Sequence, residues 1–286
     1  MSCSPRPVRS SSLTSEKDLI AAFLAEDIRT GDITTELTVP DSRGRATIHC
    51  EEDAVVAGLR YAGMAFELMG VKSELVAEDG SPVKEGQEVM RLEGPLRGIM
   101  SCERTALNII MRMSGIATAT ADVLKSCRAR NPNIRIAGTR KTTPGFRYFE
   151  KAAITMGGGE PHRFALDDMM LIKDNHIKAA GGVAEAMEAS LDAPYSMKVE
   201  IEVDTVEDAI TAAKMGADII MVDNRTPEET ARFRDAIKAI DKDIVVEASG
   251  GITVENAPEY SSSADMISMG SLTHSVRAVQ FSLDIV

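Results

Sequence analysis

The chain has 286 residues, of which 44% are hydrophobic and 27% are charged, and its formal net charge is −12. This length allows one large domain or two modest ones, and the acidic balance argues against a nucleic-acid or a membrane partner. No apolar run approaches the roughly 20 residues that a membrane-spanning helix needs. The four scattered cysteines form neither a CxxC pair nor a metal-binding spacing with histidine, so we expect reduced thiols in a cytoplasmic protein.

The first part of the chain predicts a small α/β lobe over residues 15–115. Residues 1–14 are rich in Ser, Pro and Arg and lack the apolar core of a signal peptide, which predicts a disordered leader. A helix is predicted from Ser15 to Ile28, because Ser15 is a candidate N-cap and apolar residues recur at helical spacing. Short alternating segments predict strands at 46–50 and 89–92, and an apolar face predicts a helix over 101–114.

After about residue 130, strand and helix patterns alternate, which predicts a parallel sheet in an α/β architecture. Strands are predicted at 135–138, 169–172, 199–203, 219–222, 244–247 and 266–268. Six residues fall at or just beyond the carboxyl ends of these strands: Lys141, Lys173, Glu202, Asp223, Ser249 and Gly270. A doubly wound sheet would build its site from fewer strands, so the pattern favours an α/β barrel over residues 116–273, with the site at the carboxyl ends.

Positive charge is concentrated between residues 135 and 178, where eight Lys and Arg face five Asp and Glu. Candidate ligand-binding side chains here are Arg140, Lys141, His162, Arg163 and Lys173. Arginine suits planar recognition of carboxylates and lysine supplies a compact charge for phosphate. We therefore expect a small anion with several carboxylates, or with a carboxylate and phosphates; solvated surface cations are the alternative.

Two acidic residues are candidates for a metal or a sugar hydroxyl. Glu202 and Asp223 end successive strands, and their carboxylates suit Mg²⁺. An internal salt bridge with a lysine is the alternative. Glu200 and Glu202 share one strand face, so the sequence leaves open which of them points toward the site.

Two glycine loops follow the last two predicted strands. The first contains Ser249, Gly250 and Gly251, and the second contains Gly270. In α/β barrels, backbone amides of such loops bind phosphate. Tight turns in which glycine only supplies a positive φ are the alternative.

Segments 101–108, 139–145, 162–163, 171–177, 247–252 and 268–270 resemble the quinolinate phosphoribosyltransferase family, in the expected order and over nearly the whole chain after the leader. The resemblance implies an N-terminal α/β sandwich lobe, an incomplete, seven-stranded α/β barrel, and a segment 274–286 that packs back on the lobe. The implied reaction joins quinolinate to phosphoribosyl pyrophosphate, and it gives nicotinate mononucleotide, pyrophosphate and CO₂ for NAD biosynthesis.

The resemblance also implies residue roles. The substrate-binding residues would be Arg104 from the partner subunit of a homodimer or higher homo-oligomer, together with Thr139, Arg140, His162, Arg163 and Lys173. Lys141, Glu202 and Asp223 would be catalytic and line the phosphoribosyl pyrophosphate region, with Mg²⁺ on the two carboxylates. The loops at Ser249, Gly250, Gly251 and Gly270 would hold the 5′-phosphate. Two alternatives remain: a paralogue of the same fold linked to molybdate uptake, and a non-catalytic anion-binding protein.

Overall fold

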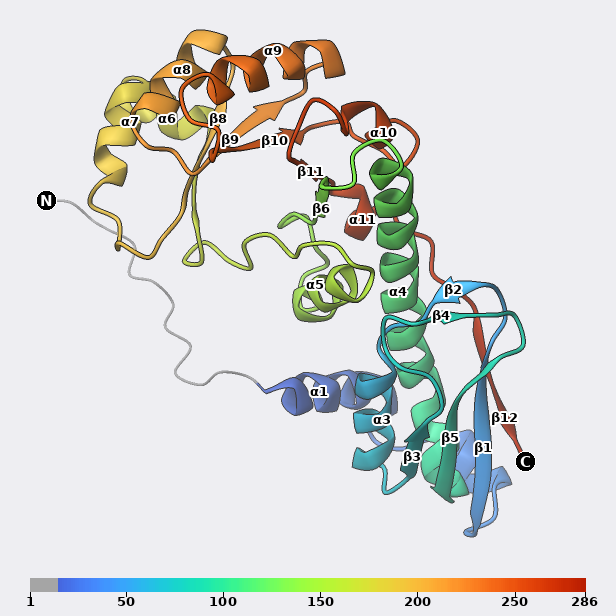
Figure 1. The fold of residues 1–286 in the computed structure, drawn as a ribbon. Helices are drawn as coiled ribbons and strands as arrows, with labels where there is room; N and C mark the ends of the chain where they lie inside the picture. The colour runs from blue at the N-terminus through green and yellow to red at the C-terminus, as the bar shows by residue number, and fades with distance from the viewer. Residues whose placement is uncertain (1–14) are drawn as a thin grey trace, which may run out of the picture.

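The computed structural model describes residues 15–286, so the predicted leader at 1–14 lies outside the described residues. The fold has two parts, one built on a four-stranded sheet and one on a six-stranded parallel sheet (Figure 1). A single long helix, α4 (Leu96–Arg128), runs along both parts (Figure 1). Over residues 15–286, no helix is long and apolar enough to cross a membrane.

The N-terminal lobe contains the predicted first helix and strands. Helix α1 (Glu16–Ile28) begins at a capping box in which the Ser15 hydroxyl accepts the Asp18 amide and the Asp18 carboxylate accepts the Ser15 amide, so the predicted N-cap is confirmed. Its other helices are α2 (Ile33–Thr38) and α3 (Leu59–Leu68). Its sheet has the order β12-β1-β5-β3, and a two-stranded sheet lies beside it. The strands are β1 (Arg43–Cys50), β2 (Ala54–Val55), β3 (Lys72–Leu75), β4 (Pro82–Val83), β5 (Glu88–Pro95) and β12 (Phe281–Ile285).

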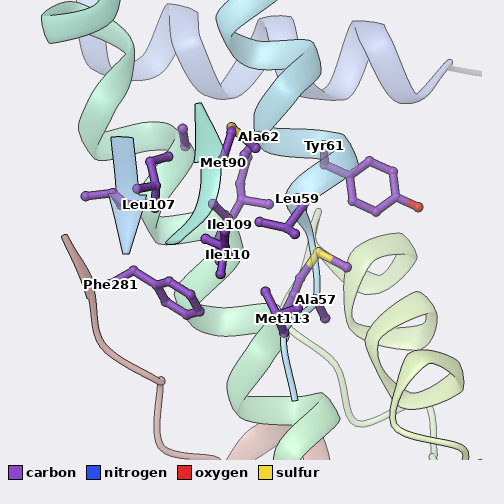
Figure 2. Close-up of a cluster of buried hydrophobic side chains, with 14 of the residues drawn as sticks. Ala57, Leu59, Tyr61, Ala62, Met90, Leu107, Ile109, Ile110, Met113 and Phe281 are labelled. Carbon is purple, nitrogen blue, oxygen red and sulfur yellow. The ribbon is translucent and has the colours of Figure 1, made fainter. Parts of the chain in front are cut away.

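The end of the chain returns to this lobe, because β12 pairs antiparallel with β1. Figure 2 shows how side chains from distant segments meet in the core of the lobe: Leu59 from α3, Met90 from β5, Ile110 and Met113 from α4, and Phe281 from β12. Each of these side chains is buried. The lobe therefore needs residues from both ends of the described chain to close its core.

Helix α4 is much longer than the helix predicted over 101–114. It extends 14 residues beyond Ser114, and its buried face continues through Ile116, Val123 and Cys127. The first of these packs in the core of the lobe, and the other two pack in the core of the second part. The predicted domain boundary at residue 115 therefore falls inside one continuous helix.

The second part has all six predicted strands, each within two residues of the predicted bounds. They are β6 (Arg135–Ala137), β7 (Met170–Ile172), β8 (Val199–Val203), β9 (Ile219–Asp223), β10 (Val245–Ser249) and β11 (Met266–Ser268). They form a parallel sheet in the order β6-β11-β10-β9-β8-β7. Its helices are α5 (Arg147–Met156), α6 (Asp174–Ala180), α7 (Val183–Ser190), α8 (Val206–Lys214), α9 (Pro227–Lys238), α10 (Ala257–Tyr260) and α11 (Ser271–His274).

The seventh strand implied by the resemblance is not found within residues 15–286, and the sheet stays open between β6 and β7. Between these two strands, Glu160 makes one parallel bridge to Ala137, with the Glu160 amide donating to Ile136 O over 2.8 Å. The bridge cannot extend into a ladder because Pro161 has no N–H to donate and His162 turns the chain with a φ of 57°. The α/β fold with a parallel sheet is confirmed, as an open sheet of six strands, but the seven strands of the expected incomplete barrel are not.

Gly115 tests how closely α4 packs against the returning C-terminal segment. A Cβ at this position would overlap Arg277 O, which is a backbone atom. We expect Gly115→Ala to lower the free energy of unfolding by about 1–3 kcal/mol through overpacking, although alanine is the better helix former. Gly63→Ala in α3 is the matched control, because its Cβ would meet only the Ser73 hydroxyl, which can rotate away. Chemical denaturation of both variants measures the effect, and equal stability would contradict the packing argument.

Candidate functional site

A cavity of about 320 Å³ lies at the carboxyl edge of the six-stranded sheet. It collects most of the predicted cationic residues, and its lining includes Thr139, Arg140, Lys141, His162, Arg163, Lys173, Asp223 and Ser249. A second cavity of about 540 Å³ adjoins it and is lined by both predicted glycine loops, at Ser249, Gly250, Gly251 and Gly270. Thr139, Lys141 and Ser249 line both cavities. The structure therefore places a cationic compartment beside a glycine-lined one, with Lys141 at their junction.

The loop that presents Arg140 and Lys141 is fixed by hydrogen bonds to its own backbone. The Lys141 amide donates to the Thr139 hydroxyl over 3.0 Å, and the Thr273 hydroxyl donates to Lys141 O over 2.8 Å. At the end of the loop, the Thr143 amide and hydroxyl both donate to the carboxylate of Glu150 in α5, each over 3.0 Å. These hydrogen bonds connect the loop to α5 and to Thr273.

His162 lies between two fully buried carboxylates. Its Nε2 is 3.2 Å from Glu247 Oε2 and 3.3 Å from Glu200 Oε2. Burial alone would lower the pKa of His162, but hydrogen bonding and charge from the two carboxylates outweigh burial and raise this pKa to about 9. Burial, together with the Glu247 charge, raises the pKa of Glu200 to about 7. His162 is therefore an imidazolium at neutral pH, although the three side chains also have the donor types of a metal site.

Glu200 and Glu202 both point to the same face of β8, at two depths. Glu200 is buried beside His162, whereas Glu202 is half-buried and its Oε2 accepts from Lys173 Nζ over 2.9 Å. The expected internal salt bridge between Glu202 and a lysine is thus present. In β9, Met221 pairs with Glu202, so Asp223 lies two residues further toward the carboxyl edge on the same face.

The glycines of the two loops have a steric role as well as a conformational one. Gly250 has a φ of 81°, and a Cβ on it would lie 2.6 Å from Asp223 Oδ1. Gly270 has an ordinary negative φ, but a Cβ there would lie 2.8 Å from the Lys141 side chain. The positive φ that the alternative of tight turns requires is found at Gly250 and Gly251, but not at Gly270. Gly270 instead leaves room for Lys141.

Arg104 is not in the cationic compartment of its own chain. It is exposed on α4 and lines a separate cavity of about 470 Å³ with Asp27, Asn108 and Arg112. Glu93 in β5 forms an ion pair with Arg45 at 3.5 Å. A role for Arg104 at a carboxyl-edge site therefore requires a second copy of the chain.

Three residues at the site were not predicted as site residues: Glu150, Lys151 and Glu247. Glu247 and Glu200 are acids inside apolar strands that are buried on both faces, and this is a signal that the sequence does contain. Glu150 and Lys151 lie on α5 and contact loops on either side of it. No sequence pattern distinguishes them from ordinary helix-surface charges.

Comparisons with known proteins agree over both parts of the chain. The model of the quinolinate phosphoribosyl transferase C-terminal domain matches residues 116–284, and that of the N-terminal domain matches residues 32–114. The chain is 44% identical to a probable nicotinate-nucleotide pyrophosphorylase (carboxylating) of Archaeoglobus fulgidus, over 88% of this chain and 97% of that one. It is 38% identical to the human nicotinate-nucleotide pyrophosphorylase (carboxylating), over 84% and 81% of the two chains. The crystal structure of NadC from Streptococcus pyogenes superposes with a TM-score of 0.88 at 34% identity, over 97% and 100% of the two chains.

The position of His162 between two carboxylates predicts the pH range in which its imidazole titrates. Its pKa is raised on folding, so the imidazolium stabilises the fold fully below about pH 6.5, and this contribution is lost as the pH rises through about 9. We expect the His162 ring resonances in NMR spectra to titrate near pH 9, and Glu247→Gln to lower that midpoint by about one pH unit or more. His274, which lies outside this carboxylate pair, is the internal control. An unchanged His162 midpoint would refute the assignment.

Proposed function

The chain belongs to the quinolinate phosphoribosyl transferase family, and from this premise we propose how its residues perform the family reaction. The enzyme transfers the phosphoribosyl group of phosphoribosyl pyrophosphate to quinolinate with loss of CO₂, and it forms nicotinate mononucleotide and pyrophosphate in NAD biosynthesis. The observation that supports the assignment of sites is the pair of adjoining cavities that share Lys141. One is cationic and suits a dicarboxylate, and the other is lined by glycine loops and suits phosphates.

Quinolinate is assigned to the cationic compartment. Arg140 Nε is buried and has no hydrogen-bond acceptor within residues 15–286, and a substrate carboxylate would supply one. Arg163 and Lys173 line the same cavity, so its cations are sufficient for two adjacent carboxylates. His162 adds the charge of its imidazolium from the floor of the compartment. The ring nitrogen would then face Lys141 and the second cavity.

The 5′-phosphate and the ribose are assigned to the glycine-lined cavity. Two serine hydroxyls in it, Ser268 Oγ and Ser271 Oγ, are buried and have no partner within residues 15–286. Phosphate oxygens accept hydrogen bonds from hydroxyls and from backbone amides of the kind that Gly250 and Gly270 leave accessible. These unpartnered donors support the phosphate assignment.

The carboxylates of Glu202 and Asp223 fit a magnesium ion, because they are hard oxygen donors on the same face of neighbouring strands, and Asp223 lines the cavity. When bound there, Mg²⁺ would neutralise charge on the pyrophosphate that departs. Glu202 forms an ion pair with Lys173 in the free protein. When both ligands bind, Glu202 would contact the cation and Lys173 would contact the anionic substrate. The carboxylates also stabilise the positive charge that develops on the anomeric carbon.

The reaction proceeds in two bond exchanges. The quinolinate nitrogen forms a bond to the anomeric carbon while the bond from that carbon to pyrophosphate breaks, and Lys141 stabilises the negative charge of the leaving group. The bond between ring carbon 2 and its carboxylate then breaks and CO₂ leaves. The electron pair stays on carbon 2 beside the positively charged nitrogen and is then protonated. The protein contributes position and charge to both exchanges.

We further propose a homodimer, or a higher homo-oligomer, in which Arg104 of one subunit completes the quinolinate site of the other. The exposure of Arg104 in its own chain supports this arrangement. A cytoplasmic location is also proposed, since Cys50, Cys102 and Cys127 are free and buried, as reduced cysteines of a cytoplasmic protein are. The paralogue and the non-catalytic alternatives gain no support, because the matched families and relatives carry the quinolinate and pyrophosphorylase names.

Substrate choice tests the assignment of the cationic compartment. Quinolinate should be converted to nicotinate mononucleotide, and nicotinate, which lacks the 2-carboxylate, should react at least about 100-fold less efficiently because its binding leaves a buried cation unpaired. Chromatographic measurement of product formation with each acid and phosphoribosyl pyrophosphate gives the ratio of kcat/KM. Similar values of kcat/KM for nicotinate and quinolinate would refute the assignment of the cationic compartment to a dicarboxylate.

Complementation tests the shared site. Arg104→Ala and Lys173→Ala should each be inactive alone. Their mixed dimer should regain activity, because one of its two sites combines the intact Lys173 of the Arg104→Ala chain with the intact Arg104 of the Lys173→Ala chain. A mixture of Arg140→Ala and Lys173→Ala is the control: both residues line the same cavity of one chain, so each site in that heterodimer lacks one of them. Activity is measured after subunit exchange, with heterodimers verified by mass. If the first mixture regains no activity, Arg104 does not act in the site of the partner subunit, and the shared site is refuted.

A further inference from the structure

We propose that Lys151 is a positioning residue for quinolinate, which holds the backbone on both sides of His162 so that His162 and Arg163 face the substrate. This inference rests on the proposed function. Lys151 lies on α5, behind the cationic compartment, and it does not line that cavity. It would therefore act on the substrate through the segment that it holds.

Two hydrogen bonds connect Lys151 to this segment. Its Nζ donates to Pro161 O and, over 2.8 Å, to Arg163 O. These two carbonyls belong to the residues immediately before and after His162. Lys151 is only 3% exposed, so the ammonium group has exchanged water for these carbonyls and depends on them for its hydrogen bonds. A buried amine bonded in this way fixes both ends of a three-residue segment.

The segment needs such a restraint because its conformation is unfavourable on its own. His162 has a φ of 57°, in the left-handed region that residues with a Cβ seldom adopt. The segment between Glu160 and β7 belongs to no strand or helix, and Pro161 ends the single bridge to β6. A sparsely populated conformation persists only where its surroundings determine it, and such positions concentrate at functional sites. The Lys151 bonds are the restraints that flank the left-handed residue.

Further contacts hold the rest of the segment, but they lie beyond His162. Arg147, one helical turn before Lys151, donates to Phe164 O over 3.2 Å. Arg163 donates to Met169 O over 3.3 Å, and the Phe164 amide donates to Asp168 over 2.7 Å. These bonds secure the chain from residue 163 onward. The His162 ring also contacts Glu200 and Glu247. Loss of Lys151 would therefore loosen the backbone on both sides of His162 without unravelling the whole segment.

The charge of Lys151 is also consistent with a site for a dianion. Burial, followed by the neighbouring charge of Arg147, lowers the pKa of Lys151 to about 8, and Arg140 and Arg163 act in the same direction. The charge of Asp168 acts in the opposite direction, but three like charges still lie near the lysine. A bound dicarboxylate would relieve this repulsion, so the same group that orients the segment also favours an anionic ligand.

Steady-state kinetics of Lys151→Met test the proposal in the full-length chain. Methionine preserves the length of the side chain and removes both hydrogen bonds. We expect the KM for quinolinate to rise about tenfold or more, with the KM for phosphoribosyl pyrophosphate within about twofold of wild type, because only the quinolinate-binding groups are displaced. Lys125→Met is the matched control, since Lys125 is exposed on α4 and should leave both constants unchanged. Lys151→Gln, which keeps a shorter donor, should give an intermediate quinolinate KM.

Different outcomes separate the possible roles. A lower kcat with both KM values unchanged would mean that Lys151 only maintains the folded fraction, and this would overturn the proposal. An equal rise in both KM values would indicate general loosening of the site and would overturn it too. If Lys151→Met does not fold, as judged by circular dichroism, the split between the two KM values in Lys151→Gln decides the question. Absence of quinolinate conversion by the wild type would instead refute the proposed function itself.

Discussion

The buried carboxylate of Glu150 is the contact on which the geometry of the site depends most. It accepts the Thr143 amide and hydroxyl, and it pairs with Arg112 of α4 at 2.8 Å. Arg112 also donates to Thr273 O, and the Thr273 hydroxyl donates to Lys141 O. A fully buried carboxylate without these partners would be very costly, so the helices and the loop must pack together with all of the bonds in place. The long helix, α5 and the loop with Arg140 and Lys141 are thereby joined at one point.

The distribution of charge around the sheet follows from this organisation. Carboxylates that are buried beneath the cavity, at Glu200 and Glu247, have His162 as their cationic partner. At the cavity surface, burial and then the charge of Arg140 lower the pKa of Arg163. Arg140 Nε has no hydrogen-bond acceptor within residues 15–286. The buried carboxylates thus have a cation within the protein, whereas the residues that line the cavity have an excess of positive charge. A dianionic substrate supplies the missing balance, and this explains why an acidic chain can maintain a cationic pocket.

The sequence predicted the strands and the polar ends of the sheet well, because both depend on local patterns. Continuous apolar runs gave all six strands of the parallel sheet, and the position of Lys173 or Asp223 just at the end of such a run required only counting. The length of α4 was underestimated because the prediction rested on an apolar face over 101–114. The close approach of Gly115 to Arg277 O, far along the chain, cannot be predicted from a local pattern. The roles of Glu150 and Lys151 depend on loops that the fold brings to α5, so no local pattern contains them. The seventh strand is not found within residues 15–286 for a local reason, because Pro161 has no N–H to donate to a ladder.

Helix α4 carries Arg104, which is proposed to act in the site of the partner subunit, and Arg112, which supports the site of its own subunit. Arg104 and Arg112 are eight residues apart, about 12 Å along the helix axis. The former is exposed, and the latter turns inward to Glu150. This continuous helix of 33 residues packs in both cores. In the proposed dimer, a partner that docks at Arg104 therefore contacts the same helix that holds the loop of Arg140 and Lys141 in its own subunit. Each subunit would thus position one cation for its neighbour and, through the same helix, the loop that it uses itself.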